Sequence, residues 1–227
     1  MAPLDPMLRS YLASAYPRNH RYRVLGGRAW PGYRLYVRYR RISALYPRPL
    51  ESLVDLSSSL GYFVLDAAAR FGCGRVLGID LHEPDLQATT AVRDHLGLPQ
   101  VRLERMRLHE LAERIEDFGG TFQTALLVNS YHYFYFGSRR SPERYETHEQ
   151  IFEALAAVCS GSVVFSNCVE PEQLPPHMLG RARSQGRTEA YHERDIRAAA
   201  EKHFLVEEHG VLGRRPLWRL IARVDPR

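Results

Sequence analysis

The chain has 227 residues, of which 44% are hydrophobic and 25% are charged, and this fits one globular core rather than two full catalytic domains or a disordered chain. No apolar run approaches the roughly 18 residues of a membrane span, and the first residues lack the pattern of a signal peptide. The three cysteines form no Cys-x-x-Cys pair. We therefore expect a protein of the reducing cytoplasm, without membrane association, disulfide scaffold or cysteine-based zinc site.

The formal net charge of +5 is spread unevenly along the chain. Residues 1–50 contain ten Arg, seven of the 13 Tyr and one acid, Asp5, whereas residues 51–227 contain 21 basic and 25 acidic residues. This pattern predicts a basic, Tyr/Arg-rich N-terminal extension over 1–50 and a separate functional body over 51–227. We expect the extension to be a cap over the substrate entrance or an interface.

Within the extension, residues 5–16 are predicted as a helix that Pro17 ends. The pattern of residues 33–46 leaves two possibilities open. Leu35, Tyr39, Ile42 and Tyr46 recur at helical spacing, but residues 33–40 also alternate at the period of a strand.

From residue 51 onward, short β-like runs alternate with helical stretches. The predicted strands are 52–56, 75–79, 101–104, 124–128, 162–166, 204–211 and 217–224. The predicted helices are 62–71, 85–96, 108–118, 142–158 and 193–203, and the Pro-, Gly- and Arg-rich stretch 170–188 is predicted to be a substrate-side loop. The order predicts an α/β fold with a Rossmann-like, doubly wound, mostly parallel seven-stranded sheet and an antiparallel C-terminal hairpin.

The segment from Leu53 to Phe63 carries the most chemical information. A strand ends in Asp55, the chain turns through three serines, and a helix follows. Small residues at such a turn allow backbone N–H groups to approach a ligand closely. The next strand is followed by a second acid, Asp80, and a carboxylate at this edge of a parallel sheet suits the hydroxyls of a ribose. We therefore expect a cofactor that contains a nucleoside.

These residues resemble the class I S-adenosylmethionine-dependent methyltransferases. The family motif Asp-x-Gly-x-Gly-x-Gly corresponds to residues 55–61, with Ser57 and Ser59 in place of two glycines and Gly61 retained. Because serine prefers negative φ, we expect this turn to avoid the conformations that only glycine adopts cheaply. The resemblance, over residues 50–224, implies that this turn holds the methionine end of the cofactor, that Asp80 holds the ribose and that Leu81 lies beside the adenine. The dinucleotide fingerprint Gly-x-Gly-x-x-Gly is absent, which argues against a nicotinamide enzyme.

Further candidates follow the third and fourth predicted strands. Met106 is predicted to cover the adenine ring and Arg107 to bind its edge through the backbone, with a core Met106 and a solvated Arg107 as the alternative. Asn129 is predicted to contact the cofactor. His132 is a candidate proton acceptor, because its ordinary pKa lies near 6.5, and Tyr131 forms a Tyr-His pair with it. Packing beneath a lid, or transfer by positioning alone, are the alternatives for His132.

The resemblance implies an enzyme that moves a methyl group from S-adenosylmethionine to an oxygen or nitrogen of a small-molecule acceptor and leaves S-adenosylhomocysteine. Two alternatives stay open: an RNA methyltransferase, of the tRNA type, that uses the basic extension, and a catalytically inactive cofactor-binding or assembly protein. A homodimer interface is another use of the Tyr/Arg surface. We expect no metal site, because the ten histidines show no metal-ligand spacing.

Overall fold

The computed structural model describes residues 3–15 and 18–223, and it divides into two compact units, Met1–Arg107 and Leu108–Arg227. The first 50 residues therefore share a unit with the first three strands of the sheet. Their expected role as a separate cap or interface stays a prediction.

The sheet of the first unit has three parallel strands in the order β5-β4-β3. They are β3 (Ser52–Asp55), β4 (Arg75–Asp80) and β5 (Val101–Arg105). The helices that connect them are α3 (Tyr62–Phe71) and α4 (Glu83–Leu96), and both end at a glycine in the left-handed conformation. Asp55 and Asp80 are the last residues of β3 and β4, as the apolar runs before them predict.

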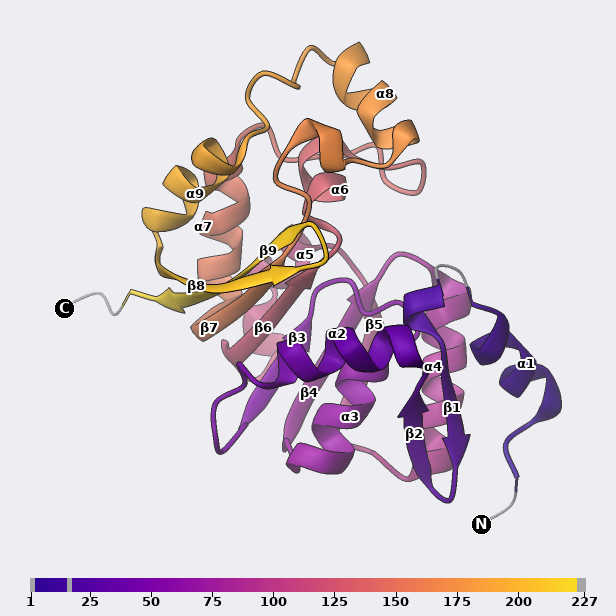
Figure 1. Cartoon of the computed structure of the whole chain (residues 1–227). Coiled ribbons are helices and arrows are strands. Elements are labelled where there is room, and N and C mark those ends of the chain that lie inside the picture. The colour runs from indigo at the N-terminus through magenta and orange to yellow at the C-terminus, as the bar shows by residue number, and fades with distance from the viewer. Residues whose placement is uncertain (1–2, 16–17, 224–227) are drawn as a thin grey trace. The chain divides into compact units, whose positions relative to one another are not determined.

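The N-terminal residues of this unit form two helices, a short 3-10 turn and a hairpin (Figure 1). The elements are α1 (Pro6–Ser14), η1 (Arg18–His20), β1 (Tyr22–Leu25), β2 (Arg28–Pro31) and α2 (Tyr33–Ser43). The helical alternative is thus the observed one for residues 33–43, because Leu35, Tyr39 and Ile42 are buried on one side of α2. The hairpin is not among the predicted elements, and the predicted end of α1 at Tyr16 lies outside the described residues.

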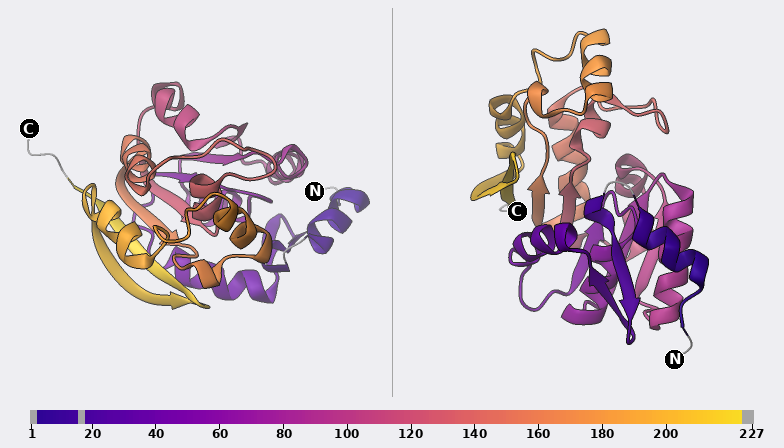
Figure 2. Two further views of the ribbon diagram at one scale, coloured as in Figure 1. Left: turned by 90° about the horizontal axis from the view of Figure 1, so that it is seen from above. Right: turned by 45° about the vertical axis from the view of Figure 1, so that its right-hand side comes forward.

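The second unit contains two parallel strands, β6 (Phe122–Val128) and β7 (Cys159–Ser166), followed by an antiparallel pair. The pair is β8 (Phe204–Leu212) and β9 (Arg215–Ala222), with β9 next to β7. Its helical elements are α5 (Leu108–Glu113), η2 (Ile115–Phe118), α6 (Tyr131–Phe136), α7 (His148–Val158), η3 (Pro171–Gln173), α8 (Pro176–Ser184) and α9 (Glu193–Glu201). Helix α9 lies against α7 and along β8 (Figure 2).

The predicted fold class is confirmed: the strands form a mostly parallel seven-stranded sheet with an antiparallel C-terminal hairpin, flanked by helices. Two local predictions are wrong. The helix expected from Pro142 begins at His148, because the side chains of Thr147 and Gln150 form a capping box there. The stretch predicted as a loop contains η3 and α8, each of which accommodates proline in its first turn.

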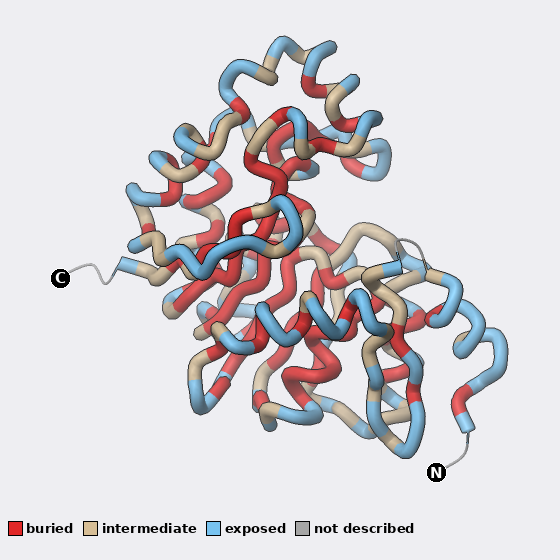
Figure 3. The backbone as a smooth tube through the Cα atoms, viewed as in Figure 1, coloured by how far each residue is buried: buried red, intermediate tan, exposed pale blue. Residues whose placement is uncertain are grey.

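Burial is deepest in β3, β4, β6 and β7, whereas β8 is mostly exposed or half-buried (Figure 3). Every residue of β3 is buried, and six of the seven residues of β6 are, which is typical of parallel strands covered on both faces. Among the described helices, none has both the length and the apolar character that crossing a bilayer requires.

Candidate cofactor site

The turn between β3 and α3 adopts left-handed backbone conformations at two positions. Gly61 has φ +67° and Ser59 has φ +47°. The expectation that serine keeps this turn out of the glycine region is therefore wrong at Ser59, where the conformation costs roughly 1–2 kcal/mol for an L-residue. Hydrogen bonds hold the turn in this shape: the Ser58 N–H donates to the carbonyl of Ile79 at 2.9 Å, and the Gly61 N–H donates to that of Ser58 at 2.8 Å.

The Asp80 carboxylate is fixed by backbone donors on both sides. The Ser59 N–H donates to Oδ2 at 2.8 Å, and the His82 N–H donates to Oδ1 at 2.9 Å. Since each carboxylate oxygen can accept two hydrogen bonds, both oxygens keep acceptor capacity for a ligand. The bond from Ser59 also ties this acid to the conformation of the turn.

The Asp55 carboxyl is buried beneath the same turn and accepts a hydrogen bond from the Ser57 N–H at 3.2 Å. Burial raises the pKa of Asp55 to about 7, and the Ser57 amide and the Arg38 guanidinium oppose that rise. This carboxyl is therefore less acidic than that of an exposed aspartate.

A small depression, open to solvent, lies over the turn. The turn and the start of α3 contribute Asp55, Ser57, Ser58, Ser59, Leu60, Gly61, Tyr62 and Phe63 to its lining. The N-terminal residues contribute Asn19, His20, Leu35 and Arg38. The structure thus brings together four predicted residues, Asp55, Ser57, Ser59 and Gly61, and joins Asp80 to them through Ser59.

Three other predicted cofactor residues do not line this depression. Leu81 and Arg107 are half-buried, and Met106 is buried. Their proposed contacts with the adenine stay predictions. Conversely, the sequence reasoning missed Asn19, His20 and Arg38, because no local motif connects the N-terminal residues to a turn some 20 to 40 positions further on.

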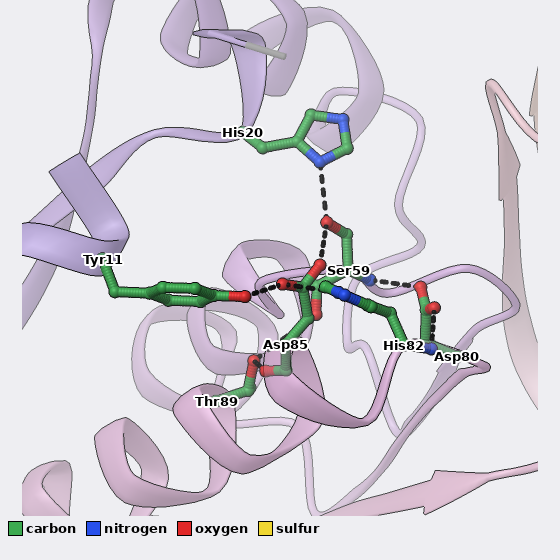
Figure 4. Close-up of polar contacts among 7 residues, drawn as sticks. All are labelled: Tyr11, His20, Ser59, Asp80, His82, Asp85 and Thr89. Atoms are coloured by element: carbon green, nitrogen blue, oxygen red, sulfur yellow. Dashed lines mark hydrogen bonds and ion pairs between the residues drawn. The ribbon is translucent and has the colours of Figure 1, made fainter. Parts of the chain in front are cut away.

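A hydrogen-bond network joins two N-terminal residues, His20 and Tyr11, to the turn and to Asp85 (Figure 4). His20 Nδ1 lies 2.8 Å from Ser59 Oγ, and that hydroxyl donates to Asp85 Oδ2 at 3.1 Å. The Tyr11 hydroxyl donates to Asp85 Oδ1 at 2.6 Å, and His82 Nδ1 lies 3.0 Å from the same oxygen. Asp85, in the first turn of α4, therefore connects α1, the serine turn and the segment after β4.

In the second unit, the predicted residues Asn129, Tyr131 and His132 follow β6. Asn129 has φ +67° and donates its N–H to the Ser166 carbonyl at 2.9 Å. A non-glycine residue held in this conformation is enriched at functional sites. The Asn167 side chain fixes the following backbone by accepting hydrogen bonds from the amides of Ser130 and Tyr131, at 2.7 and 3.0 Å.

Tyr131 is fully buried among aromatic rings, and its hydroxyl lies 2.7 Å from His148 Nδ1. The other ring nitrogen of His148, Nε2, lies 2.7 Å from the Ala190 carbonyl, and since only a donor can bind there, Nδ1 of the neutral ring accepts from the tyrosine. The catalytic role predicted for Tyr131 stays a prediction, and its hydroxyl already has a structural partner.

Replacing Tyr131 with phenylalanine is expected to lower the free energy of unfolding by about 1–3 kcal/mol, because it leaves the His148 acceptor buried without its donor. Urea denaturation measures this loss. The matched control is Tyr133→Phe, at an exposed neighbouring position on the same helix, which is expected to change stability by less than about 0.5 kcal/mol. Equal effects of the two substitutions would show that the buried pair contributes nothing.

His132 is only 2% exposed, and neither ring nitrogen has a hydrogen-bond partner among the described residues. Burial lowers the pKa of His132 to about 3, and Arg215 and His177 add to that effect. The ring is therefore neutral at physiological pH. Both ring nitrogens are therefore available for a hydrogen bond to a water molecule or a ligand.

No protein-family model and no curated protein matches this sequence. Solved structures do resemble the fold. The PH0226 protein from Pyrococcus horikoshii OT3 has a TM-score of 0.59 at 16% identity, over 85% of this chain and 92% of that one. An O-methyltransferase family protein from Burkholderia thailandensis has a TM-score of 0.59 at 16% identity, over 86% of this chain and 57% of the other. The bifunctional kinase-methyltransferase WbdD has a TM-score of 0.56 at 17% identity over 83% of this chain, which spans 38% of WbdD.

The chain has the class I S-adenosylmethionine-dependent methyltransferase fold.

In a methyltransferase fold of this class, the residues over the turn fit the cofactor that the fold implies. Asp80 offers acceptor capacity for ribose hydroxyls, and Arg38 places a cation in the lining of the depression for a carboxylate. The backbone passes close to α4 at Gly61, where a side chain would collide with Thr89. No group of three or more His, Cys, Asp or Glu side chains that could hold a metal ion occurs among the residues described.

Proposed function

We propose that this chain is an S-adenosylmethionine-dependent methyltransferase whose first unit binds the cofactor. The observation that carries the proposal is the depression over the turn of residues 55–61, with the Asp80 carboxylate locked to that turn by the Ser59 amide. When bound, S-adenosylmethionine supplies a methyl group activated on a sulfonium, and S-adenosylhomocysteine remains after transfer.

Each residue of the site has a defined task in this proposal. Asp80 accepts a hydrogen bond from one ribose hydroxyl, and Arg38 binds the carboxylate of the methionyl group. Gly61 lets the turn pass close to Thr89 of α4 and so keeps the shape of the site. Asp55, with its raised pKa, holds the Ser57 amide and hence the shape of the turn.

For the second unit we propose that His132 accepts the proton that an acceptor hydroxyl or amine loses. Its unpartnered nitrogens, among the residues that are described, support this role, whereas the burial that lowers its pKa makes the ring a weak base in the absence of an acceptor. The acceptor class we favour is a small molecule, since α6 is made of aromatic residues and His132, and one of them, Tyr133, is exposed.

Calorimetry with the full chain tests the cofactor proposal. S-adenosylmethionine is expected to bind with one site per chain and a dissociation constant between about 1 μM and 1 mM, the usual range for enzyme ligands. S-adenosylhomocysteine should compete for the site, whereas NAD at the same concentration should not bind. Absence of saturable binding at millimolar S-adenosylmethionine would sink the methyltransferase proposal and favour a protein that has lost the cofactor.

RNA is the second candidate acceptor, because eight of the ten Arg in residues 1–50 are exposed. Three of the eight, Arg34, Arg40 and Arg41, lie on α2 with Tyr33, which is 82% exposed. Arginines that neutralise phosphates make affinity fall steeply with salt. A filter-binding titration with a structured RNA at 50 and 200 mM salt separates the two acceptor classes. We expect weak binding at both concentrations, and tight binding lost at the higher one would favour RNA.

A further inference from the structure

Ser59, in the turn of residues 55–61, is in hydrogen-bond contact with His20 of the N-terminal residues (Figure 4). Its amide binds Asp80, and its hydroxyl lies between the His20 ring and the Asp85 carboxylate. One side chain of the turn is therefore shared by the acid proposed to bind the ribose and by a histidine of η1. The proton positions along this chain of contacts follow from the donor and acceptor capacities of its members.

A carboxylate accepts hydrogen bonds and donates none. The hydrogen bond between Ser59 Oγ and Asp85 Oδ2 must therefore use the only proton of the serine hydroxyl. The Ser59 oxygen can then only accept at its 2.8 Å contact with His20, so His20 Nδ1 carries the proton. Tyr11 reinforces this arrangement, because its hydroxyl donates to the other oxygen of Asp85.

The second nitrogen of the His20 ring is consequently an acceptor. Burial lowers the pKa of His20 to about 4, with Arg38 acting in the same direction and Asp85 against it. The ring is therefore neutral at physiological pH, and Nε2 carries a lone pair. Nε2 is buried and has no hydrogen-bond partner among the described residues, while His20 itself lines the depression over the turn. A buried acceptor without a donor costs stability unless something supplies that donor.

We propose that His20 is a ligand-binding residue, whose Nε2 accepts a hydrogen bond from the ribose hydroxyl of the nucleoside cofactor that does not donate to Asp80. A ribose hydroxyl is the favoured donor, since the serine that holds His20 also donates its amide to Asp80. Ser59 and Asp85 are positioning residues that set the tautomer. This inference rests on the proposed function and deepens it, because it makes η1 part of the cofactor site.

Two substitutions of His20 distinguish the contributions of its two ring nitrogens to ligand binding. The amide nitrogen of His20→Asn can replace Nδ1–H toward Ser59 but leaves nothing in place of Nε2, whereas the amide oxygen of His20→Gln can replace the Nε2 acceptor. We expect His20→Asn to weaken binding of S-adenosylhomocysteine about tenfold and His20→Gln to keep it within about threefold. Equal affinity of wild type and His20→Asn would overturn the inference.

Deoxyribose analogues of the ligand make the test specific. The 2′-deoxy and 3′-deoxy forms of S-adenosylhomocysteine each lack one hydroxyl, and in the wild type the form without the bonded hydroxyl should bind about tenfold more weakly. In His20→Asn that loss should largely disappear, because the partner is already gone. If removal of that hydroxyl weakened binding by the same factor in the wild type and in His20→Asn, the inference would be overturned.

Nitrogen NMR of the imidazole reads the tautomer without any ligand. We expect Nδ1–H in the wild type and a changed tautomer balance in Asp85→Asn, whose amide can donate to Ser59. Observation of Nε2–H in the wild type would overturn the inference even if the cofactor binds. If the wild type binds neither S-adenosylmethionine nor S-adenosylhomocysteine, the proposed function fails and this inference with it, whereas binding unaffected by His20→Asn removes only the inference.

Discussion

Replacing Gly61 with alanine is expected to lower the free energy of unfolding by about 2–5 kcal/mol. The backbone at Gly61 has φ +67°, a conformation that costs an L-residue roughly 1–2 kcal/mol. A Cβ at this position would also overlap Thr89 Cγ2 and lie 2.9 Å from Thr89 Oγ1. Thr89 is completely buried on α4, so relief requires backbone shifts, at about 1–3 kcal/mol for an overpacked core. Urea denaturation measures the total.

Gly72→Ala is the matched control, because it separates strain from collision. Gly72 ends the same helix with φ +64°, and a Cβ there would have no atom within 4 Å. The free energy of unfolding of Gly72→Ala should therefore fall only by the cost of the left-handed backbone, roughly 1–2 kcal/mol. Gly61→Ala in a Thr89→Ala background should recover part of the difference, though not all, since Thr89 Cβ stays 3.1 Å away. Equal losses in the free energy of unfolding for Gly61→Ala and Gly72→Ala would show that the contact with Thr89 of α4 does not restrict a side chain at Gly61.

Replacing Asp80 with alanine is expected to weaken binding of S-adenosylmethionine roughly 10- to 100-fold. Hydrogen bonds to a charged partner contribute about 1.5–3 kcal/mol, and each 1.4 kcal/mol is tenfold in affinity. The substitution also removes the acceptor for the Ser59 and His82 amides, so the turn loses its link to the end of β4. Calorimetry of both proteins gives the ratio of dissociation constants.

Glu83→Gln is the control for the loss of a nearby negative charge. Glu83 is exposed in the first turn of α4, three residues beyond Asp80, and its removal should change cofactor affinity less than about threefold. Asp80→Asn keeps one acceptor oxygen, and its affinity for S-adenosylmethionine should lie between those of Asp80→Ala and the wild type. If Asp80→Ala binds the cofactor as the wild type does, the ribose is not held at the end of β4, although the fold remains that of a methyltransferase.

The ends of the strands in the first unit could be predicted from the sequence, because they depend on residues that are neighbours in the chain. Apolar runs before Asp55 and Asp80 predict β3 and β4, and both acids end their strands. The backbone conformation of the turn could not be predicted in this way. Ser59 adopts positive φ because its amide is bonded to Asp80, 21 positions further on, and propensity alone favours the opposite conformation.

The N-terminal residues show the same limit more strongly. Their charge and tyrosine content mark them as distinct, but the two periods of residues 33–46 could not be told apart until burial selected one face of α2. His20 carries no motif, and only its approach to Ser59 makes it part of the site.

The sequence by itself determined the fold class, the chain order of the seven strands of the main sheet and the acids at the ends of two strands, since these depend on periodicity and on residues close together in the chain. Only the tertiary structure decided which N-terminal residues line the cofactor turn, which serine adopts a glycine conformation and which nitrogen of His20 carries the proton. Those outcomes depend on hydrogen bonds and burial between residues far apart in sequence, and the free energy of such contacts overrides local preference.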